Sequence, residues 1–194
     1  MERASPKQIM RIVALGPVGA GKTTLIKTIS EIDVVETDRA ATDDSALLKP
    51  NTTVAMDFGR ITFGADMAVH IYGTPGQERF DFMWDILVRR AHALMLLVPL
   101  HRPSDFFMAS KMLRYLQYHA SEVPLVVVGT HSDLPDAWPV EEVLPALGIE
   151  PGAAIPIFAI NATQVRDVVQ VLIALIERYQ RWVLSRVQAE PVRQ

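Results

Sequence analysis

Hydrophobic residues gather along the chain in short runs of strand length, separated by stretches with helical spacing. The nearly continuous apolar runs at 93–100 and 125–129 are typical of strands buried on both faces of a parallel sheet. Six strands are predicted, at 9–15, 53–58, 67–72, 93–100, 125–129 and 155–160. Helices are predicted at 22–30, 78–90, 104–119, 139–148 and 163–186. This alternation is typical of an α/β fold in which helices cover both faces of a mainly parallel sheet.

The connections and ends of these elements add detail. The connection between the second and third strands, around residues 60–65, is short, so an antiparallel hairpin is expected, because a parallel pair would need a long crossover. Ser104 is placed to cap the third helix, and Gly148 is placed to end the fourth. The last helix has one predicted apolar face, formed by Val165, Val168, Val169, Leu172, Ile173, Ile176 and Tyr179.

One long segment, residues 34–51, breaks the pattern, because it is polar, carries both charges and shows little periodicity. A loop of this length inside a compact domain is typically a functional lid or a disordered segment, so we expect a long mobile loop. The remainder predicts one domain over 8–186. Short flexible ends are expected at 1–7 and 187–194.

Composition narrows the class of protein. The chain is 49% hydrophobic and 21% charged, as in ordinary globular proteins, and its net charge of −3 argues against a nucleic-acid partner. It has no cysteine, which excludes disulfides and thiol catalysis. There is no apolar run of about 20 residues, no secretion signal and no lipidation motif. We therefore expect a soluble, cytoplasmic protein without a membrane anchor.

The segment between the first strand and the first helix, residues 16–23, fits the phosphate-loop pattern G-x-x-x-x-G-K-[ST] at every required position. Gly16 and Gly21 let the backbone wrap around an anion, and the following helix N-terminus adds partial positive charge. Lys22 would reach the β- and γ-phosphates, and the Thr23 hydroxyl would bind Mg²⁺. The alternative is a chance glycine-rich turn. The residues assigned to the nucleotide here are Gly16, Val18, Gly19, Ala20, Gly21, Lys22, Thr23 and Thr24.

A second segment, Gly-Thr-Pro-Gly-Gln-Glu at 73–78, resembles the Asp-x-x-Gly-Gln-Glu segment of Ras-superfamily GTPases. With the phosphate loop, it resembles more narrowly a bacterial Ras-like group that includes the gliding-motility polarity GTPases and the conservon-type GTPases of filamentous bacteria. The conservon type is especially similar to the run at 52–61, the Gly-Thr-Pro-Gly-Gln segment and Trp84-Asp85. The resemblance covers about residues 8–186. It implies a P-loop NTPase of the Ras-like G-domain type, with a six-stranded, mostly parallel sheet, one antiparallel edge strand and about five helices.

By this resemblance, Gly76 meets the γ-phosphate and Gln77 orients the attacking water. Thr53 matches the threonine that closes onto Mg²⁺ and the γ-phosphate, with Thr52 as the fallback. Taken alone, such a pair of threonines is also explained by β-propensity. The aromatic residues that follow, Phe80, Phe82 and Trp84, are at helical spacing and favour a core position. If exposed, they would be anchors for a partner.

Two further segments resemble the guanine-binding motifs of the superfamily. Thr130, His131 and Asp133 lie in a segment that matches Asn/Thr-Lys-x-Asp at its first and fourth places. A carboxylate at Asp133 would bind the adjacent N1–H and N2 donors of guanine, which adenine lacks, although an aspartate that caps a loop is a common alternative. The family's Ser-Ala-x segment is matched in position by Asn161, Ala162 and Thr163. By this resemblance, the Ala162 N–H would donate to guanine O6.

The sequence departs from the family pattern at three places. Gly73 stands where an aspartate usually holds Mg²⁺ through water, so the site is expected to lack that carboxylate. Val18 stands where Ras has glycine, and a branched side chain there should slow hydrolysis. His131 replaces a lysine, and its neutral imidazole would stack without bringing a fixed charge.

The resemblance to the gliding-motility GTPases implies that a switch arginine within the chain neutralises charge in the transition state. Arg39 in the long loop and Arg79 after the glutamine are the candidates, and Arg60 has a weaker claim. The alternative for each is a solvated side chain.

The resemblance implies a slow GTPase that binds GTP or GDP with Mg²⁺ and acts as a switch in bacterial signalling or cell polarity. It also implies a small roadblock-domain (LC7-type) partner, with an unknown effector, and a monomer or nucleotide-dependent dimer. One alternative is a nucleotide-binding scaffold with little hydrolysis. Another is a small kinase, which would need arginines that clamp a second substrate; after the central strands only Arg102 and Arg114 are available.

Overall fold

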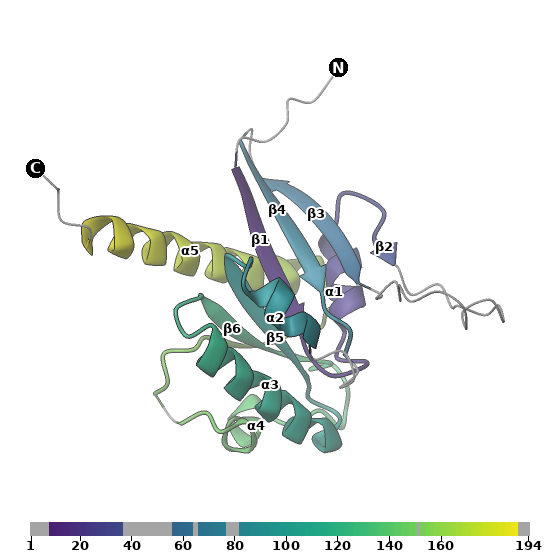
Figure 1. Cartoon of the computed structure of the whole chain (residues 1–194). Helices are drawn as coiled ribbons and strands as arrows, with labels where there is room; N and C mark the ends of the chain where they lie inside the picture. Colours follow the sequence, from purple (N-terminus) through teal and green to yellow (C-terminus); the bar gives the residue numbers. More distant parts are fainter. Residues whose placement is uncertain (1–7, 37–55, 64–65, 77–81, 151, 190–194) are drawn as a thin grey trace, which may run out of the picture.

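The computed structural model describes residues 8–36, 56–63, 66–76, 82–150 and 152–189. Within them a single sheet lies between two layers of helices (Figure 1). The strands are β1 (Gln8–Leu15), β2 (Val35–Glu36), β3 (Asp57–Phe63), β4 (Met67–Gly73), β5 (Ala93–Pro99), β6 (Leu125–Thr130) and β7 (Ile157–Ala159). The helices are α1 (Lys22–Ile29), α2 (Phe82–Val88), α3 (Phe106–His119), α4 (Val140–Leu147) and α5 (Val165–Ala189), with a 3₁₀ turn at Pro103–Asp105.

The strand order in the sheet is β2-β3-β4-β1-β5-β6-β7. The strands from β4 to β7 in this order are parallel, whereas β3 runs antiparallel to β4. The predicted six-stranded, mostly parallel sheet with an antiparallel hairpin is therefore confirmed. The two-residue strand β2 extends the sheet beyond β3, to which it pairs antiparallel.

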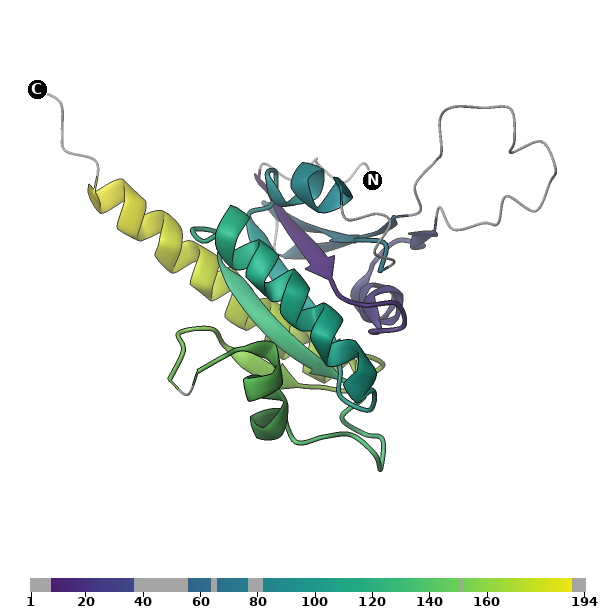
Figure 2. The same cartoon turned by 60° about the horizontal axis from the view of Figure 1, so that its bottom comes forward.

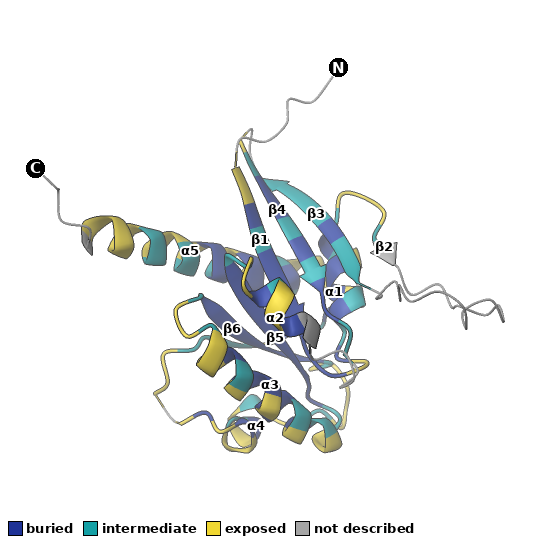
Figure 3. Ribbon diagram, in the orientation of Figure 1, coloured by how far each residue is buried: buried dark blue, intermediate teal, exposed yellow. Residues whose placement is uncertain are grey.

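The two faces of the sheet are covered by different helices. Buried side chains of α1 and α5 pack on one face, and those of α2, α3 and α4 pack on the other. Figure 2 shows α3 and α5 on opposite sides of the sheet, and Figure 3 shows β5 and β6 in the buried interior. Every residue of β5 and β6 is buried, as their continuous apolar sequence predicts.

The bounds of the antiparallel strand were predicted wrongly in part. The strand β3 begins at Asp57 and continues to Phe63, past the predicted end at residue 58, while residues 53–55 lie outside the described part. Gly59, the residue after the predicted end of the strand, lies inside it. A Cβ on Gly59 would come within 2.5 Å of Ile26 in α1, so glycine here allows the helix to pack closely on the sheet.

Three predicted helix features also differ. Ser104 does not cap α3, because it lies inside the 3₁₀ turn and Asp105 precedes the first α-helical residue. The helix α5 continues to Ala189, so residues 187–189 of the expected tail are helical. Val165 and Ile173 are 55% and 46% exposed and face solvent, because the buried stripe of α5 is rotated from the predicted face and includes Val171 and Leu175 instead.

The core position of Trp84 is confirmed, since its side chain is 2% exposed and packs against α3 and the sheet. Phe80 lies outside the described residues, and only the backbone of Phe82 is described. In the described part of the chain, no helix is both long enough and apolar enough to cross a membrane.

Candidate nucleotide-binding site

The phosphate loop occupies the turn between β1 and α1, at the carboxyl edge of the parallel strands. Gly21 precedes the helix with φ of 83°, a left-handed conformation that favours glycine. The Lys22 ammonium donates hydrogen bonds to the backbone carbonyls of Gly16 and Pro17, each at 2.7 Å. The lysine is thereby held inside the curve of the loop, 7% exposed, with its charge beside the expected phosphates.

Burial lowers the pKa of Lys22 to about 8. The nearby Asp57 carboxylate opposes this shift, and the positive charge of Arg102 adds to it. The loop therefore holds its lysine at an energetic cost that an anion in the loop would remove.

The carboxylate of Asp57 lies beside Thr23, the proposed Mg²⁺ ligand. The Thr23 hydroxyl donates a hydrogen bond of 2.5 Å to Oδ2 of Asp57, the first residue of β3. Asp57 is paired with Gly73 across the β3–β4 hairpin, and a Cβ on Gly73 would lie 3.2 Å from Oδ2 of Asp57. The expectation that Gly73 leaves the site without a carboxylate is therefore wrong, because the neighbouring strand supplies one. A hydroxyl and a carboxylate at this position fit Mg²⁺, which prefers oxygen ligands.

Gly76 lies directly against the phosphate loop. A Cβ on this residue would come within 2.5 Å of the Val18 nitrogen and 2.6 Å of the Pro17 carbonyl carbon, which are backbone atoms that cannot move aside. Only glycine permits this approach. The segment between β4 and α2 is thus placed beside the loop, as the assignment of Gly76 requires.

The opposite flank of the loop is formed by the ends of β6 and β7. A Cβ on Gly21 would lie 3.7 to 3.8 Å from Ala162, His131 and Thr130, so these residues converge on the start of α1. The buried Thr130 hydroxyl donates to the Ala20 carbonyl at 3.0 Å. Thr28 of α1, which belongs to none of the sequence motifs, donates to the Ala162 carbonyl at 2.7 Å.

The predicted base-binding residues have clear local structures. His131 adopts φ of 61° and packs against His101, with ring centroids 4.4 Å apart and the ring planes tilted by 52°. Its pKa is lowered, first by burial and then by His101 and Arg102, and Asp133 acts in the opposite direction. A lowered pKa keeps the His131 imidazole neutral at pH 7, as expected. Asp133 itself is exposed at the edge of this flank.

The turn after β7 is fixed by its own side chains. The Asn161 side-chain oxygen accepts hydrogen bonds from the Thr163 backbone N–H at 2.9 Å and from its hydroxyl at 2.7 Å. The Asn161 backbone N–H donates to Asp167 at 3.0 Å, in the first turn of α5. These bonds fix the turn that places Ala162 beside Gly21 of the loop.

Several predicted residues are not brought into the described site. Five of them lie outside the described residues: Gln77, Thr53, Thr52, Arg39 and Arg79. Arg60 is described, but it lies three residues along β3 from Asp57, opposite His70 in the hairpin. Burial lowers the pKa of His70, and the charge of Arg60 adds to this effect. An odd spacing along a strand turns Arg60 to the other face of the sheet, away from the Thr23–Asp57 pair.

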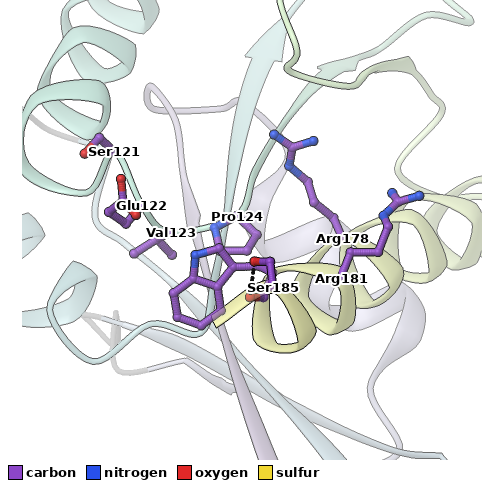
Figure 4. Close-up of a pocket in the computed structure, with 8 residues that line it drawn as sticks. Ser121, Glu122, Val123, Pro124, Arg178, Arg181 and Ser185 are labelled. Carbon is purple, nitrogen blue, oxygen red and sulfur yellow. Dashed lines mark hydrogen bonds between the residues drawn. The ribbon is translucent and has the colours of Figure 1, made fainter. Parts of the chain in front are cut away.

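A cavity of about 380 Å³ lies at the opposite edge of the sheet, where β6 begins (Figure 4). Its lining comes from residues 121–124 and from Arg178, Arg181, Trp182 and Ser185 of α5. None of the predicted nucleotide residues lines it.

Fold and site together define a P-loop nucleotide-binding protein: a loop after β1 holds its lysine, and residues from β3, β4, β6 and β7 converge around it. Residues 11–180 match the Ras family, and the chain belongs to this family of small GTPases. It is 30% identical to Ras-related protein Rab-27A of Canis lupus familiaris over 186 residues, which covers 87% of this chain and 78% of that protein. Ras-related protein Rab-10 of Caenorhabditis elegans is 27% identical over 140 residues, covering 70% and 64%.

Proposed function

We propose that the chain is a molecular switch that binds GTP or GDP with Mg²⁺ and hydrolyses GTP slowly on its own. The observation that carries the proposal is the Lys22 ammonium held in the loop beside the Thr23–Asp57 pair. The phosphates would lie along the backbone N–H groups of residues 18–21, next to this ammonium. Thr23 would bind Mg²⁺ directly and Asp57 would act through water, while the cation withdraws negative charge from the phosphates.

Hydrolysis would proceed by in-line attack of a water molecule on the γ-phosphorus. The bond from the γ-phosphorus to the bridging oxygen breaks, and GDP and inorganic phosphate leave, with the proton of the water ending on the phosphate. Gln77 would orient the water, and the Gly76 N–H would hold the γ-phosphate. These groups orient the reactants and supply no strong base, so turnover without a partner should be slow.

The guanine base of the nucleotide would be recognised by the residues that follow β6 and β7. A carboxylate at Asp133 can accept from both N1–H and the N2 amino group of guanine, and adenine offers no such pair of donors. The neutral His131 would lie along the base, and the Ala162 N–H would donate to guanine O6. Selection of GTP over ATP supports this proposal only if it depends on Asp133.

For the cellular role we propose bacterial signalling or cell polarity in the cytoplasm, with a roadblock-domain protein as the partner that accelerates hydrolysis. The support is the resemblance of residues 52–61 and 73–77 to the conservon-type and gliding-motility GTPases. Whether the chain acts as a monomer or as a nucleotide-dependent dimer would be measured by light scattering with GDP and with a non-hydrolysable GTP analogue.

The proposal is tested by identifying the nucleotide that co-purifies and by measuring GTP and ATP affinity with and without Mg²⁺. Single-turnover hydrolysis is then compared between the wild type and Gln77→Leu. We expect GTP to be preferred, and the variant to bind GTP but to lose hydrolysis. Preference for ATP would overturn the proposal.

One observation favours a second candidate, a scaffold that holds GTP with little hydrolysis. The branched side chain of Val18 is 56% exposed at the position beside Gly76. In a scaffold, Gln77→Leu would leave the already negligible rate unchanged.

A further inference from the structure

Arg102 lies against the phosphate loop although it comes from a distant part of the chain. It follows β5, in the turn that leads through the 3₁₀ segment to α3. Its Nη2 donates a hydrogen bond to the backbone carbonyl of Val18. Its Nη1 lies 2.9 Å from the point where a Cβ on Gly19 would stand. The guanidinium therefore touches two successive residues of the loop.

Backbone hydrogen bonds in the turn around Arg102 fix the position of its Cα atom. The Arg102 N–H donates to the Pro99 carbonyl at 3.1 Å, and the Asp105 N–H donates to the Arg102 carbonyl at 3.0 Å. The Asp105 carboxylate lies 2.5 Å from Nη2 of Arg102. The Arg102 Nε is buried and has no hydrogen-bond acceptor among the described residues. A guanidinium has five N–H donors, so the contacts described leave donor capacity for a further anion.

The charge of Arg102 acts on the other side chains of the site. Burial is the main cause of the lowered pKa values of Lys22 and His131, and the positive charge of Arg102 lowers both further. Two cations, Lys22 and Arg102, are thus close enough to repel each other across the loop. A polyanion bound between them would replace this repulsion with two favourable contacts.

We propose that Arg102 is a phosphate-binding residue whose guanidinium contacts the β- and γ-phosphates from the Val18–Gly19 side of the loop. This inference rests on the proposed GTPase function. It supplies, from the turn after β5, the arginine that the sequence placed at Arg39, Arg79 or Arg60. Among those three only Arg60 is described, and it lies on a different strand beside His70.

The chemical consequence concerns charge that develops during hydrolysis. As the bond to the γ-phosphorus breaks, negative charge moves onto the bridging oxygen and the β-phosphate of the departing GDP. A guanidinium beside Gly19 would be placed to stabilise this charge, because a planar fork of N–H donors binds phosphate oxygens in pairs. Arg102 would then aid both GTP binding and the rate.

The competing role for Arg102 is to brace the empty loop through the Val18 carbonyl and nothing more. The two roles predict different effects on nucleotide affinity and hydrolysis rate. The test therefore uses variants that change the charge and the shape of the side chain separately. Arg102→Gln keeps an amide N–H donor but removes the charge. Arg102→Lys keeps the charge but removes the fork. Arg181→Ala, on the exposed side of α5 at the other edge of the sheet, is the matched control.

GTP and GDP affinities, single-turnover hydrolysis of bound GTP, and the melting temperature without nucleotide are measured for all four proteins. We expect Arg102→Gln to bind GTP about 10- to 100-fold more weakly, as for loss of a charge-assisted hydrogen bond. Its hydrolysis should fall by at least about 10-fold. Arg102→Lys should retain most of the affinity and lose most of the rate enhancement. Arg181→Ala should match the wild type.

The inference is overturned if Arg102→Gln lowers the melting temperature but leaves GTP affinity and hydrolysis within about twofold of the wild type. That outcome would assign Arg102 to bracing the loop. If Arg102→Gln does not fold, unchanged hydrolysis in Arg102→Lys overturns the catalytic part of the inference. Failure of the wild type and of Arg181→Ala to bind GTP would instead refute the proposed function.

Discussion

Asp57 is the residue on which the metal site most depends. Its carboxylate accepts from the Thr23 hydroxyl at 2.5 Å, so it faces the position where Mg²⁺ would bind. In Asp57→Asn the side chain still accepts this hydrogen bond but has no charge. We expect the gain in GTP affinity that Mg²⁺ provides to fall by about 10-fold or more, and the affinity in EDTA to stay the same. Titration of a fluorescent GTP analogue with and without Mg²⁺ measures both.

The control for Asp57 moves the carboxylate from position 57 on β3 to position 73 on β4. A Cβ on Gly73 would lie 3.1 Å from the Asp57 Cβ, so Gly73→Asp alone crowds two carboxylates together and should weaken Mg²⁺ binding. In the double variant Asp57→Gly, Gly73→Asp, the carboxylate is returned from the other strand. Recovery of the Mg²⁺ effect in the double variant is expected. An unchanged Mg²⁺ effect in Asp57→Asn would show that the carboxylate serves only to hold Thr23.

Lys22 makes stability and binding depend on pH. Its pKa is about 8 in the folded chain and 10.5 when unfolded, so between these values the unfolded chain binds more protons. The nucleotide-free chain should therefore become more stable as pH rises from about 8 to about 10.5, by up to about 3 kcal/mol. Urea unfolding at pH 7, 8.5 and 9.5 measures this rise; a constant or falling stability would contradict it.

The same shift predicts proton uptake on nucleotide binding. The phosphates favour charged Lys22, so at pH 9 GDP binding should take up close to one proton, and at pH 6.5 almost none at this residue. Calorimetry at pH 9 in two buffers with different ionisation enthalpies would show different heats. Equal heats at pH 9 would mean that Lys22 is already charged in the empty loop.

The sequence predicted those site residues that lie together in one continuous motif. The phosphate loop is eight consecutive residues, and its glycines, Lys22 and Thr23 could be assigned from spacing alone. Asp57 is 34 residues from Thr23, and Arg102 is 84 residues from Val18. Their contacts arise only when β3 and the turn after β5 are placed by the sheet. An aspartate opposite Gly73 in the predicted hairpin was the one available signal.

At the element scale, the strands that are buried on both faces were predicted well, because a short unbroken apolar run between turn residues fits little besides a central strand. The ends of elements were harder. The predicted strand stopped before Gly59, which lies inside β3 and allows α1 to approach the sheet. Ser104 was predicted as a cap but lies in a 3₁₀ turn. The helix α5 continues to Ala189, where Trp182 stacks on Tyr179 and lies under the Arg186 guanidinium. Such contacts extend a helix beyond its apolar stripe.

Gly148 gives a prediction that belongs to one helix. It ends α4 with φ of 74°, and its N–H donates to the carbonyls of Leu144 and Pro145. A Cβ would meet no atom within 4 Å, so Gly148→Ala tests backbone strain alone. We expect a loss of about 1 kcal/mol in the free energy of unfolding, with a smaller loss for Gly148→Asn, which tolerates this conformation better. Urea unfolding measures both, and GTP affinity should not change. A larger loss for Asn than for Ala would refute the assignment to backbone strain.

At the scale of the whole molecule, the alternation of strands and helices predicted a three-layer α/β fold, and the structure has it. The order of strands could not be derived from the alternation, because β1 lies between β4 and β5, far from its neighbours in sequence. That order brings the carboxyl ends of β1, β5 and β6 together. It explains why residues from five separate segments surround one loop.

The loop is tied to distant layers of the fold, so a nucleotide should stabilise the molecule as a whole. Thr130 bonds the loop to β6, and Thr28 bonds α1 to the turn after β7. At a concentration of 100 times its dissociation constant, GDP with Mg²⁺ should add about 2.7 kcal/mol, which raises the melting temperature by about 5–10 °C. ATP at the same concentration should raise it far less, and Asp133→Asn should remove the difference. An equal rise with ATP in the wild type would mean that the phosphate loop alone binds the ligand.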